Sequence, residues 1–347
     1  MKVVIIHLDG LGFEYLKKSN LSFIKNLKGN LYRMQIFPGY FVNEVSLFTG
    51  LTPNQHNMED IFILNESLSP FKNPLSLLIP KKLYRFFAYF YGYETYISIN
   101  PPKRHFQKFV PISKISPRFF EDSFPSLLNE HNLKFEYVSS LHFNLNNIKT
   151  AIKENDCVYA TNLTYDHILH EHGAFHQAKT DIDNFVKNLH KFLNEKYKDD
   201  FCIILLSDHG MVDVHSQIYL DKSLNEDSLT FVDSTILRIW SNKEITFNNI
   251  NAELIDTKQL NGKYKYYKKF VANPGYIFSP NFFQGTNFIK GMHGYKSTNS
   301  PHDAFLIIHN PKAKKHYITS CSIIDVAPTI LNMFKIDKLS TMTGRVL

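Results

Sequence analysis

Residues 3–10 read VVIIHLDG, a run of apolar residues that ends in Asp9 and Gly10. A short apolar run closed by glycine is typical of a buried, usually parallel β-strand. A second run, FCIILL at residues 201–206, ends in the same way at SDHG, residues 207–210. Two such strands predict a sheet that is covered on both faces, which is the arrangement of α/β proteins.

Helical patterns alternate with further strand-like runs along the chain. Residues 42–48 read as a helix, and Gly50 stands where a C-terminal cap is expected. An apolar stripe of helical spacing runs from Asp181 to Tyr197, and residues 304–308 read as another buried strand. This alternation predicts an α/β fold with a largely parallel central sheet.

Two irregular stretches interrupt the alternation, at about residues 58–150 and 215–290. We expect residues 1–347 to form a single domain in which these stretches are insertions that build a cap or small subdomain. Within the first, residues 81–90 mix Lys and Arg with aromatic side chains. That mixture favours a helix with a packed aromatic face over a helix on a membrane surface or a platform for nucleic acid.

The composition excludes several classes of protein. Of 347 residues, 44% are apolar, which is too many for a disordered chain, and no uncharged apolar stretch reaches the length of about 18 residues that a membrane span needs. Lys and Arg outnumber Asp and Glu by 39 to 32, so the net charge of +7 favours an anionic partner. The three scattered cysteines do not indicate a disulfide framework, and the apolar run at residues 3–6 is too short for a signal sequence. We therefore expect a cytoplasmic protein.

Aspartate and histidine recur where the predicted strands end. Ligands of open α/β sheets gather at the carboxyl ends of the strands, so we expect these side chains to lie together. Carboxylate and imidazole groups in this number suit two divalent metal ions, and the histidine content favours Zn²⁺ with Mn²⁺ as the alternative. The six residues are Asp9, Asp166, His170, Asp208, His209 and His293.

Seven short motifs are spread from one end of the chain to the other. They are IIHLDG at 5–10, SLFTGLTPNQH at 46–56, D-x-x-x-H-x-x-G at 166–173, SDHGM at 207–211, MHGY at 292–295, DVAPTIL at 325–331 and TGRVL at 343–347. In order and combination they resemble the alkaline phosphatase superfamily, in its type I phosphodiesterase and nucleotide pyrophosphatase branch. The resemblance implies a three-layer α/β/α fold.

The resemblance also implies how the six ligands divide. One metal ion would be held by Asp166, His170 and His293. The other would be held by Asp9, Asp208 and His209, with a nucleophilic Ser or Thr hydroxyl as a further ligand. Such a hydroxyl attacks phosphorus, and water then cleaves the covalent intermediate.

The nucleophile is where this sequence departs from the family pattern. Counting back from Thr49-Gly50, the position falls at Tyr40, or at Phe41 if one residue is deleted, and neither is an aliphatic alcohol. Three alternatives remain open: Tyr40 as the nucleophile, a metal-bound hydroxide with Tyr40 shaping the pocket, or Ser46 or Thr49 as a displaced nucleophile. Asn43, one helical turn beyond Tyr40, either donates to a phosphoryl oxygen or supports the turn.

The sequence therefore predicts a metal-dependent hydrolase or transferase that cleaves a phosphodiester or a nucleotide-type pyrophosphate. The expected partner is an anionic, phosphate-containing substrate, and no specific nucleic-acid binding is indicated. A rival hypothesis is a metal-binding protein without hydrolytic activity that recognises a phosphorylated glycan, lipid or nucleotide, or that performs other chemistry on the same metals. The tyrosine at position 40 favours the rival, whereas the full set of six ligands favours the enzyme.

Overall fold

The structure is a computed structural model. It describes residues 1–58, 62–69, 71–78, 80, 83, 108–111, 121–177, 181–220, 228–247, 249–283, 285–297, 302–313 and 316–347. Apart from Leu83, the basic and aromatic stretch at 81–90 lies outside these residues, so its predicted helix is untested. Among the helices that are described, none is long and apolar enough to cross a membrane.

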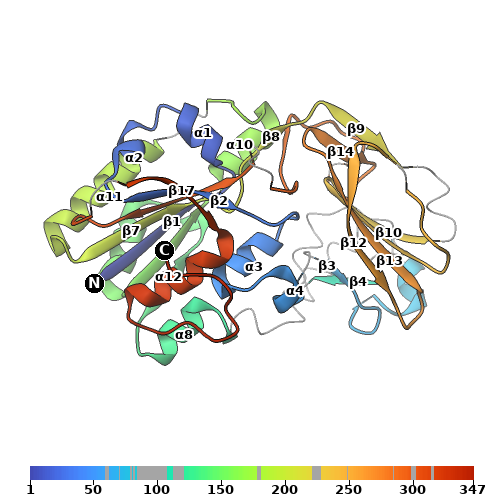
Figure 1. The fold of residues 1–347 in the computed structure, drawn as a ribbon, viewed down its shortest axis with the longest axis horizontal. Helices are drawn as coiled ribbons and strands as arrows, with labels where there is room; N and C mark the ends of the chain where they lie inside the picture. Colours follow the sequence, from blue (N-terminus) through green and yellow to red (C-terminus); the bar gives the residue numbers. More distant parts are fainter. Residues whose placement is uncertain are drawn as a thin grey trace.

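A seven-stranded sheet forms the centre of the larger part of the molecule (Figure 1), in the order β17-β2-β16-β7-β1-β6-β5. Its strands are β1 (Lys2–Leu8), β2 (Asn30–Gln35), β5 (Phe135–Val138), β6 (Cys157–Asn162), β7 (Phe201–Leu206), β16 (Ala304–His309) and β17 (His316–Ser322). β1 runs parallel to β6 on one side and to β7 on the other, and only the pairings of β16 with β2 and β7 are antiparallel. The largely parallel sheet predicted from the sequence is confirmed.

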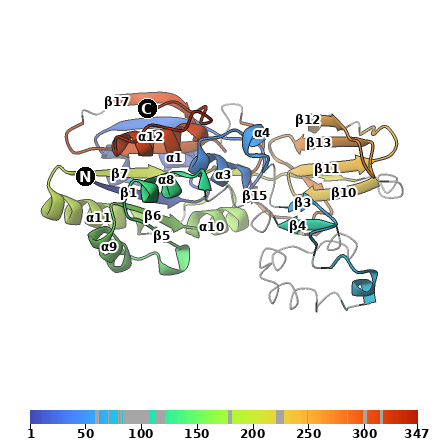
Figure 2. The same cartoon turned by 90° about the horizontal axis from the view of Figure 1, so that it is seen from below.

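Helices cover both faces of this sheet. One face packs against α1 (Phe13–Lys18), α2 (Ser22–Asn26), α9 (Leu145–Glu154), α10 (Thr164–His172) and α11 (Ile182–Tyr197). The other face packs against α3 (Val42–Thr49), α8 (Phe124–Glu130) and α12 (Val326–Met333), the last preceded by the short helix η6 (Ile323–Asp325). Figure 2 shows α12 and α11 on opposite sides of the sheet. The strands are apolar without alternation because residues on both faces are buried: Val4 and Ile6 join one core, Val3 and Ile5 the other. The three-layer fold is thus confirmed.

A smaller antiparallel sheet lies beside the main one (Figure 1), in the order β10-β11-β13-β12. Its strands are β10 (Ser228–Asp233), β11 (Ile236–Ser241), β12 (Ala252–Gln259) and β13 (Tyr266–Ala272). A pair of short strands, β3 (Phe62–Leu64) and β4 (Phe109–Pro111), packs on it through Phe62 and Phe109, which contact Phe231. The remaining short elements are α4 (Pro53–His56), η1 (Pro74–Leu78), η4 (Ser140–His142), β8 (Val212–Asp213), β9 (Ser216–Tyr219), β14 (Tyr276–Ser279) and β15 (Gly291–Met292).

The two expected insertions go to different places. Strands β3 and β4 of the first pair with each other and pack on the smaller sheet, which is built from the second. However, β5, α8 and α9 also fall within residues 58–150, and they belong to the main sheet and its helical layers. Of the described residues in the first range, Phe62, Phe71 and Phe109 therefore pack against the smaller sheet.

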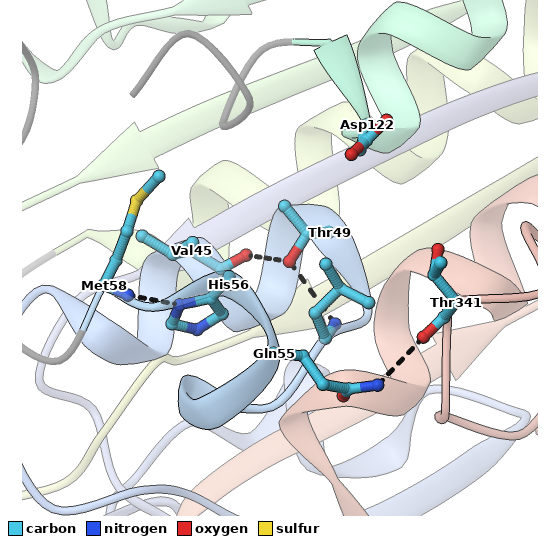
Figure 3. Close-up of a pocket in the computed structure, with 8 residues that line it drawn as sticks. Val45, Thr49, Gln55, His56, Met58, Asp122 and Thr341 are labelled. Atoms are coloured by element: carbon cyan, nitrogen blue, oxygen red, sulfur yellow. Dashed lines mark hydrogen bonds between the residues drawn. The ribbon is translucent and has the colours of Figure 1, made fainter. Parts of the chain in front are cut away.

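Hydrogen bonds join the C-terminal segment of the chain to η6 and α4. The Asp325 carboxylate accepts hydrogen bonds from the backbone N–H of Ser322 at 2.9 Å and of Arg345 at 2.8 Å. The Gln55 side chain on α4 donates to the carbonyl of Thr341 at 3.1 Å (Figure 3). These bonds hold the C-terminal segment against η6 and α4.

Candidate metal centre

The six predicted ligands arise from chain segments that the main sheet brings to one edge. β1 lies between β6 and β7 and pairs with both in parallel, with His7 level with Thr161 on one side and Leu206 on the other. The carboxyl ends of the three strands therefore coincide. Asp9 follows β1, Asp208 and His209 follow β7, and the helix after β6 carries Asp166 and His170. His293 comes from the loop after β15.

Gly10 allows the turn after β1 to lie directly against α10. Its φ is +76°, in the left-handed region that favours glycine. A Cβ at this position would lie 2.8 Å from the Cα of Asp166. The glycine of the first motif therefore serves close packing, and it brings Asp9 next to Asp166.

All six side chains form one continuous cluster. The Nε2 atom of His209 lies 3.2 Å from an oxygen of Asp9, 3.5 Å from Asp208 and 4.0 Å from Asp166. On the other side of Asp166, its Oδ1 atom lies 3.2 Å from Nε2 of His170 and 3.6 Å from Nε2 of His293. The rings of His209 and His293 stack with their centroids 3.6 Å apart.

The residues fit divalent metal ions. Two ligands of one tetrahedral Zn²⁺ are about 3.4 Å apart, given bond lengths of about 2.1 Å, and the pair distances in the cluster lie around that value. Among the described residues, the buried Oδ1 atoms of Asp9 and Asp166 make no hydrogen bond of good geometry and face imidazole nitrogens at 3.2 Å, and Nδ1 of His293 has no hydrogen-bond partner. The Nδ1 atom of His170 pairs with the carbonyl of Gly291 at 2.8 Å, which leaves Nε2 as the ligand atom.

Charges within the cluster shift the pKa values of its members in opposite directions. Burial raises the pKa of Asp9 to about 6, and the charge of Asp208 adds to the rise. Burial alone would lower the pKa of His209, but Asp208 and Asp9 outweigh it and raise the pKa to about 10. For Asp166, burial is outweighed by the imidazole of His170, 3.2 Å away, which holds the pKa below its usual range. A protonated His209 therefore balances part of the carboxylate charge in the metal-free protein, and metal binding must displace its proton.

Tyr40 turns its hydroxyl toward the smaller sheet. The hydroxyl donates to the carbonyl of Asp233 at 3.1 Å and accepts from the N–H and side chain of Thr235, each at 3.3 Å. Its ring stacks on Phe283 and meets the ring of His293 edge-on, with centroids 4.9 Å apart. This arrangement fits a residue that walls the site and ties the loop to the β10–β11 turn better than it fits a nucleophile. Burial raises the pKa of the phenol further above its ordinary value, which also opposes ionisation.

Asn43 is fully buried, and its amide is used within its own loop. Its Oδ1 accepts from the N–H of Phe37 at 2.8 Å, and its Nδ2 donates to the carbonyl of Phe37 at 3.0 Å. Of the two roles considered for Asn43, support of the turn is the one that these contacts describe. A direct bond to a phosphoryl oxygen stays a prediction.

The displaced-nucleophile alternative has little support in the contacts of α3. The Thr49 hydroxyl donates to the carbonyl of Val45 at 2.7 Å (Figure 3). The Ser46 hydroxyl pairs with Nε2 of His56 at 3.0 Å, an arrangement that looks like a nucleophile and its base. However, the backbone N–H of Met58 donates to Nδ1 of His56, so the neutral ring carries its proton on Nε2 and donates it to Ser46. His56 is then no base for Ser46. The cavity of about 280 Å³ beside these residues is lined by none of the six ligands.

Two residues beside the cluster were not singled out from the sequence. His7 is 6% exposed, and its Nε2 lies 3.0 Å from Oδ1 of Asp208. The signal was available, because residues two apart on a strand point the same way, and His7 precedes Asp9 by two. Glu44, in the first turn of α3, interacts electrostatically with the cluster. Burial raises the pKa of Glu44 to about 7, Asp208 and Asp9 add to the rise, and His7 opposes it. No sequence signal separates Glu44 from an ordinary helix-start carboxylate.

Comparison with known proteins identifies one matching family and several similar solved structures. Residues 84–269, more than half of the chain, match the sequence profile of the type I phosphodiesterase / nucleotide pyrophosphatase family. A search of curated proteins returns no significant match. Among solved structures, human ectonucleotide pyrophosphatase/phosphodiesterase 5 is similar with a TM-score of 0.69 at 15% identity, over 99% of this chain and 97% of that one. The murine protein of the same name has a TM-score of 0.67 at 15% identity, over 98% and 96%. An inactive variant of the murine protein in complex with AMP has the same TM-score at 16% identity, over the same shares. At these identities the likeness shows the fold.

Proposed function

The chain belongs to the type I phosphodiesterase / nucleotide pyrophosphatase family, a family of hydrolases, and from this premise we propose that it hydrolyses a nucleotide-type phosphodiester or pyrophosphate at a two-metal site. The observation that carries the proposal is the cluster of three carboxylates and three imidazoles at the carboxyl edge of the sheet. Its buried Asp9 and Asp166 Oδ1 atoms make no hydrogen bond of good geometry among the described residues, and each lies 3.2 Å from the Nε2 atom of His209 or His170. Such atoms are costly unless a cation satisfies them.

Asp166, His170 and His293 would hold one cation, and Asp9, Asp208 and His209 the other. Two bound divalent cations would supply charge stabilisation to the attacking and leaving oxygens of a phosphoryl displacement. The histidine share of the donors favours Zn²⁺ over Mn²⁺. Around the cluster, the side chain of Asn43 keeps the loop at 37–41 in shape, and the ring of Tyr40 closes the site beside His293.

We propose further that water, and not a side chain, attacks phosphorus. The hydroxyls of Tyr40, Ser46 and Thr49 are all engaged in other contacts. In this reaction one P–O bond forms to water, one P–O bond to the leaving group breaks, and the proton that water loses balances the one the leaving group takes up.

One observation supports a nucleotide as substrate. The similar murine structure contains AMP, which has the phosphate and the nucleoside that such a substrate would present.

The test is turnover by protein reconstituted with Zn²⁺ or Mn²⁺. Bis(p-nitrophenyl) phosphate should be cleaved faster than p-nitrophenyl phosphate, because the family cleaves diesters. Asp208→Ala should lower turnover by at least about 100-fold, since loss of a ligand exceeds the cost of losing an outer partner. Asp199→Ala, on an exposed turn far from the cluster, is the matched control. Metal-loaded protein that cleaves neither ester nor a nucleotide pyrophosphate would contradict the proposal.

A further inference from the structure

His7 lies at the metal centre, but the ligand scheme above gives it no part. It lies on β1 between the apolar core and Asp9, and it is almost fully buried. A buried imidazole among carboxylates needs a partner for each ring nitrogen. The partners of the two ring nitrogens indicate what His7 does.

One ring nitrogen faces the second metal site. The Nε2 atom of His7 lies 3.0 Å from Oδ1 of Asp208, and the ligand atoms of His7, Asp9 and Asp208 all lie within 4.8 Å of one another. Two donors of one tetrahedral Zn²⁺ are about 3.4 Å apart, so the His7–Asp208 pair is spaced much as the His209–Asp9 pair is, at 3.2 Å.

The other ring nitrogen is held from behind. Nδ1 of His7 lies 3.0 Å from the hydroxyl of Tyr159, a fully buried residue on β6, and the two rings meet edge-on. Burial keeps the pKa of Tyr159 well above its ordinary value, so its hydroxyl stays neutral. A histidine that binds metal through one nitrogen usually donates the N–H of the other to such an acceptor, which sets its tautomer and orientation.

The second site also has a place for another donor. The resemblance assigns that place to a Ser or Thr hydroxyl, but this chain carries Tyr40, whose hydroxyl contacts Asp233 and Thr235. Asp9, Asp208 and His209 alone supply three protein donors. A fourth from His7 completes a tetrahedral set.

We propose that His7 is a ligand of the second cation and replaces the missing hydroxyl at that site. The inference rests on the two-metal site of the proposed function. The competing role is that of a positioning residue, in which His7 only fixes Asp208 by its hydrogen bond. The two roles differ in what a glutamine at position 7 should do, because a glutamine amide can donate to Asp208 in the manner of Nε2 but is a poor zinc ligand.

The experiment is Zn²⁺ binding by full-length protein, with stoichiometry and affinity measured by competition with a coloured chelator. Wild type should bind two Zn²⁺, and H7Q should keep one tight site and lose more than about 100-fold in affinity at the other, beyond the about 10–100-fold that an outer partner contributes. Tyr159→Phe should weaken the same site within that smaller range. His309→Gln, a buried histidine at the opposite edge of the sheet, is the control and should bind as wild type does.

The outcomes distinguish failure of the two-metal site from failure of the His7 inference alone. Wild type that binds fewer than two Zn²⁺ would overturn the two-metal site and the inference with it. Wild type with two sites and H7Q with two unchanged sites would overturn the inference alone. Should H7Q not fold, an anomalous difference map of Zn²⁺-loaded wild type decides: a peak about 2.1 Å from Nε2 of His7 supports the ligand, and a peak beyond about 3 Å overturns it.

Discussion

Tyr40→Phe separates a tyrosine that walls the site from a tyrosine that attacks phosphorus. The substitution removes the bond to the Asp233 carbonyl and leaves the N–H of Thr235 without its acceptor, whereas the Thr235 hydroxyl keeps the carbonyl of His293 at 3.1 Å. One lost hydrogen bond and one orphaned buried donor cost about 1–3 kcal/mol of folding free energy. For a chain of 347 residues this is a fall in Tm of about 1–4 °C.

Turnover should fall by less than about threefold, because the hydroxyl takes no part in bond formation. Removal of a true nucleophile would cost about 10⁴-fold or more. The assay is cleavage of bis(p-nitrophenyl) phosphate at matched metal content, with Tyr295→Phe as control, a buried tyrosine whose hydroxyl also donates to a backbone carbonyl. A chiral phosphorothioate diester adds the stereochemistry: one displacement by water inverts phosphorus, whereas two displacements retain its configuration. Loss of turnover by more than about 10³-fold, or retention, would refute the reasoning.

Three further predictions concern the cluster. Gly10→Ala should lose about 1–3 kcal/mol of stability and part of its metal content, because the φ of this residue is +76° and the new Cβ would press on Asp166. Calorimetry and metal analysis check this. A variant with the stability and metal content of the wild type contradicts it. Zn²⁺ affinity should rise about tenfold per pH unit between pH 7 and 9, because His209, with its pKa raised to about 10, must give up a proton to bind metal. Titration calorimetry in two buffers counts that proton. An affinity that does not change with pH would contradict this prediction. Burial raises the pKa of Glu44 from 4.5 to about 7, so its stabilising contribution is complete below pH 4.5 and is lost as the pH rises through 7. Glu44→Gln should therefore stabilise the metal-free protein by about 3 kcal/mol at pH 8 and by nothing at pH 4. Denaturant titrations that show equal gains at both pH values would exclude this.

The predictions that the structure confirms concern features that short segments specify. The helix expected at 42–48 is α3, and Gly50 caps it in the left-handed conformation with φ +65°. The stripe from Asp181 to Tyr197 became α11. In each case the spacing of apolar residues and one end signal lie within a few turns, so distant contacts do not alter the outcome.

The boundaries of the insertions were harder to place. Residues 124–154 include α8, β5 and α9 of the main sheet and its helical layers, although polar Asn, Glu and Lys side chains dilute their apolar pattern. β5 is an edge strand, and its pattern is only partly buried, so it lacks the continuous apolar run that marked β1 and β7. What assigns these segments to the main sheet is their packing on helices and strands far away in the chain.

By itself, the sequence determined the α/β alternation and the gathering of Asp9, Asp208 and His209 at one edge, because parallel strands end together and these residues follow β1 and β7 directly. Only the tertiary structure decided how the neighbouring side chains are used. The hydroxyl of Tyr40 is held by residues more than 190 positions away, and His7 meets Asp208 across 201 positions. Orientation of this kind depends on which distant groups satisfy each polar atom, and no local pattern of residues encodes it.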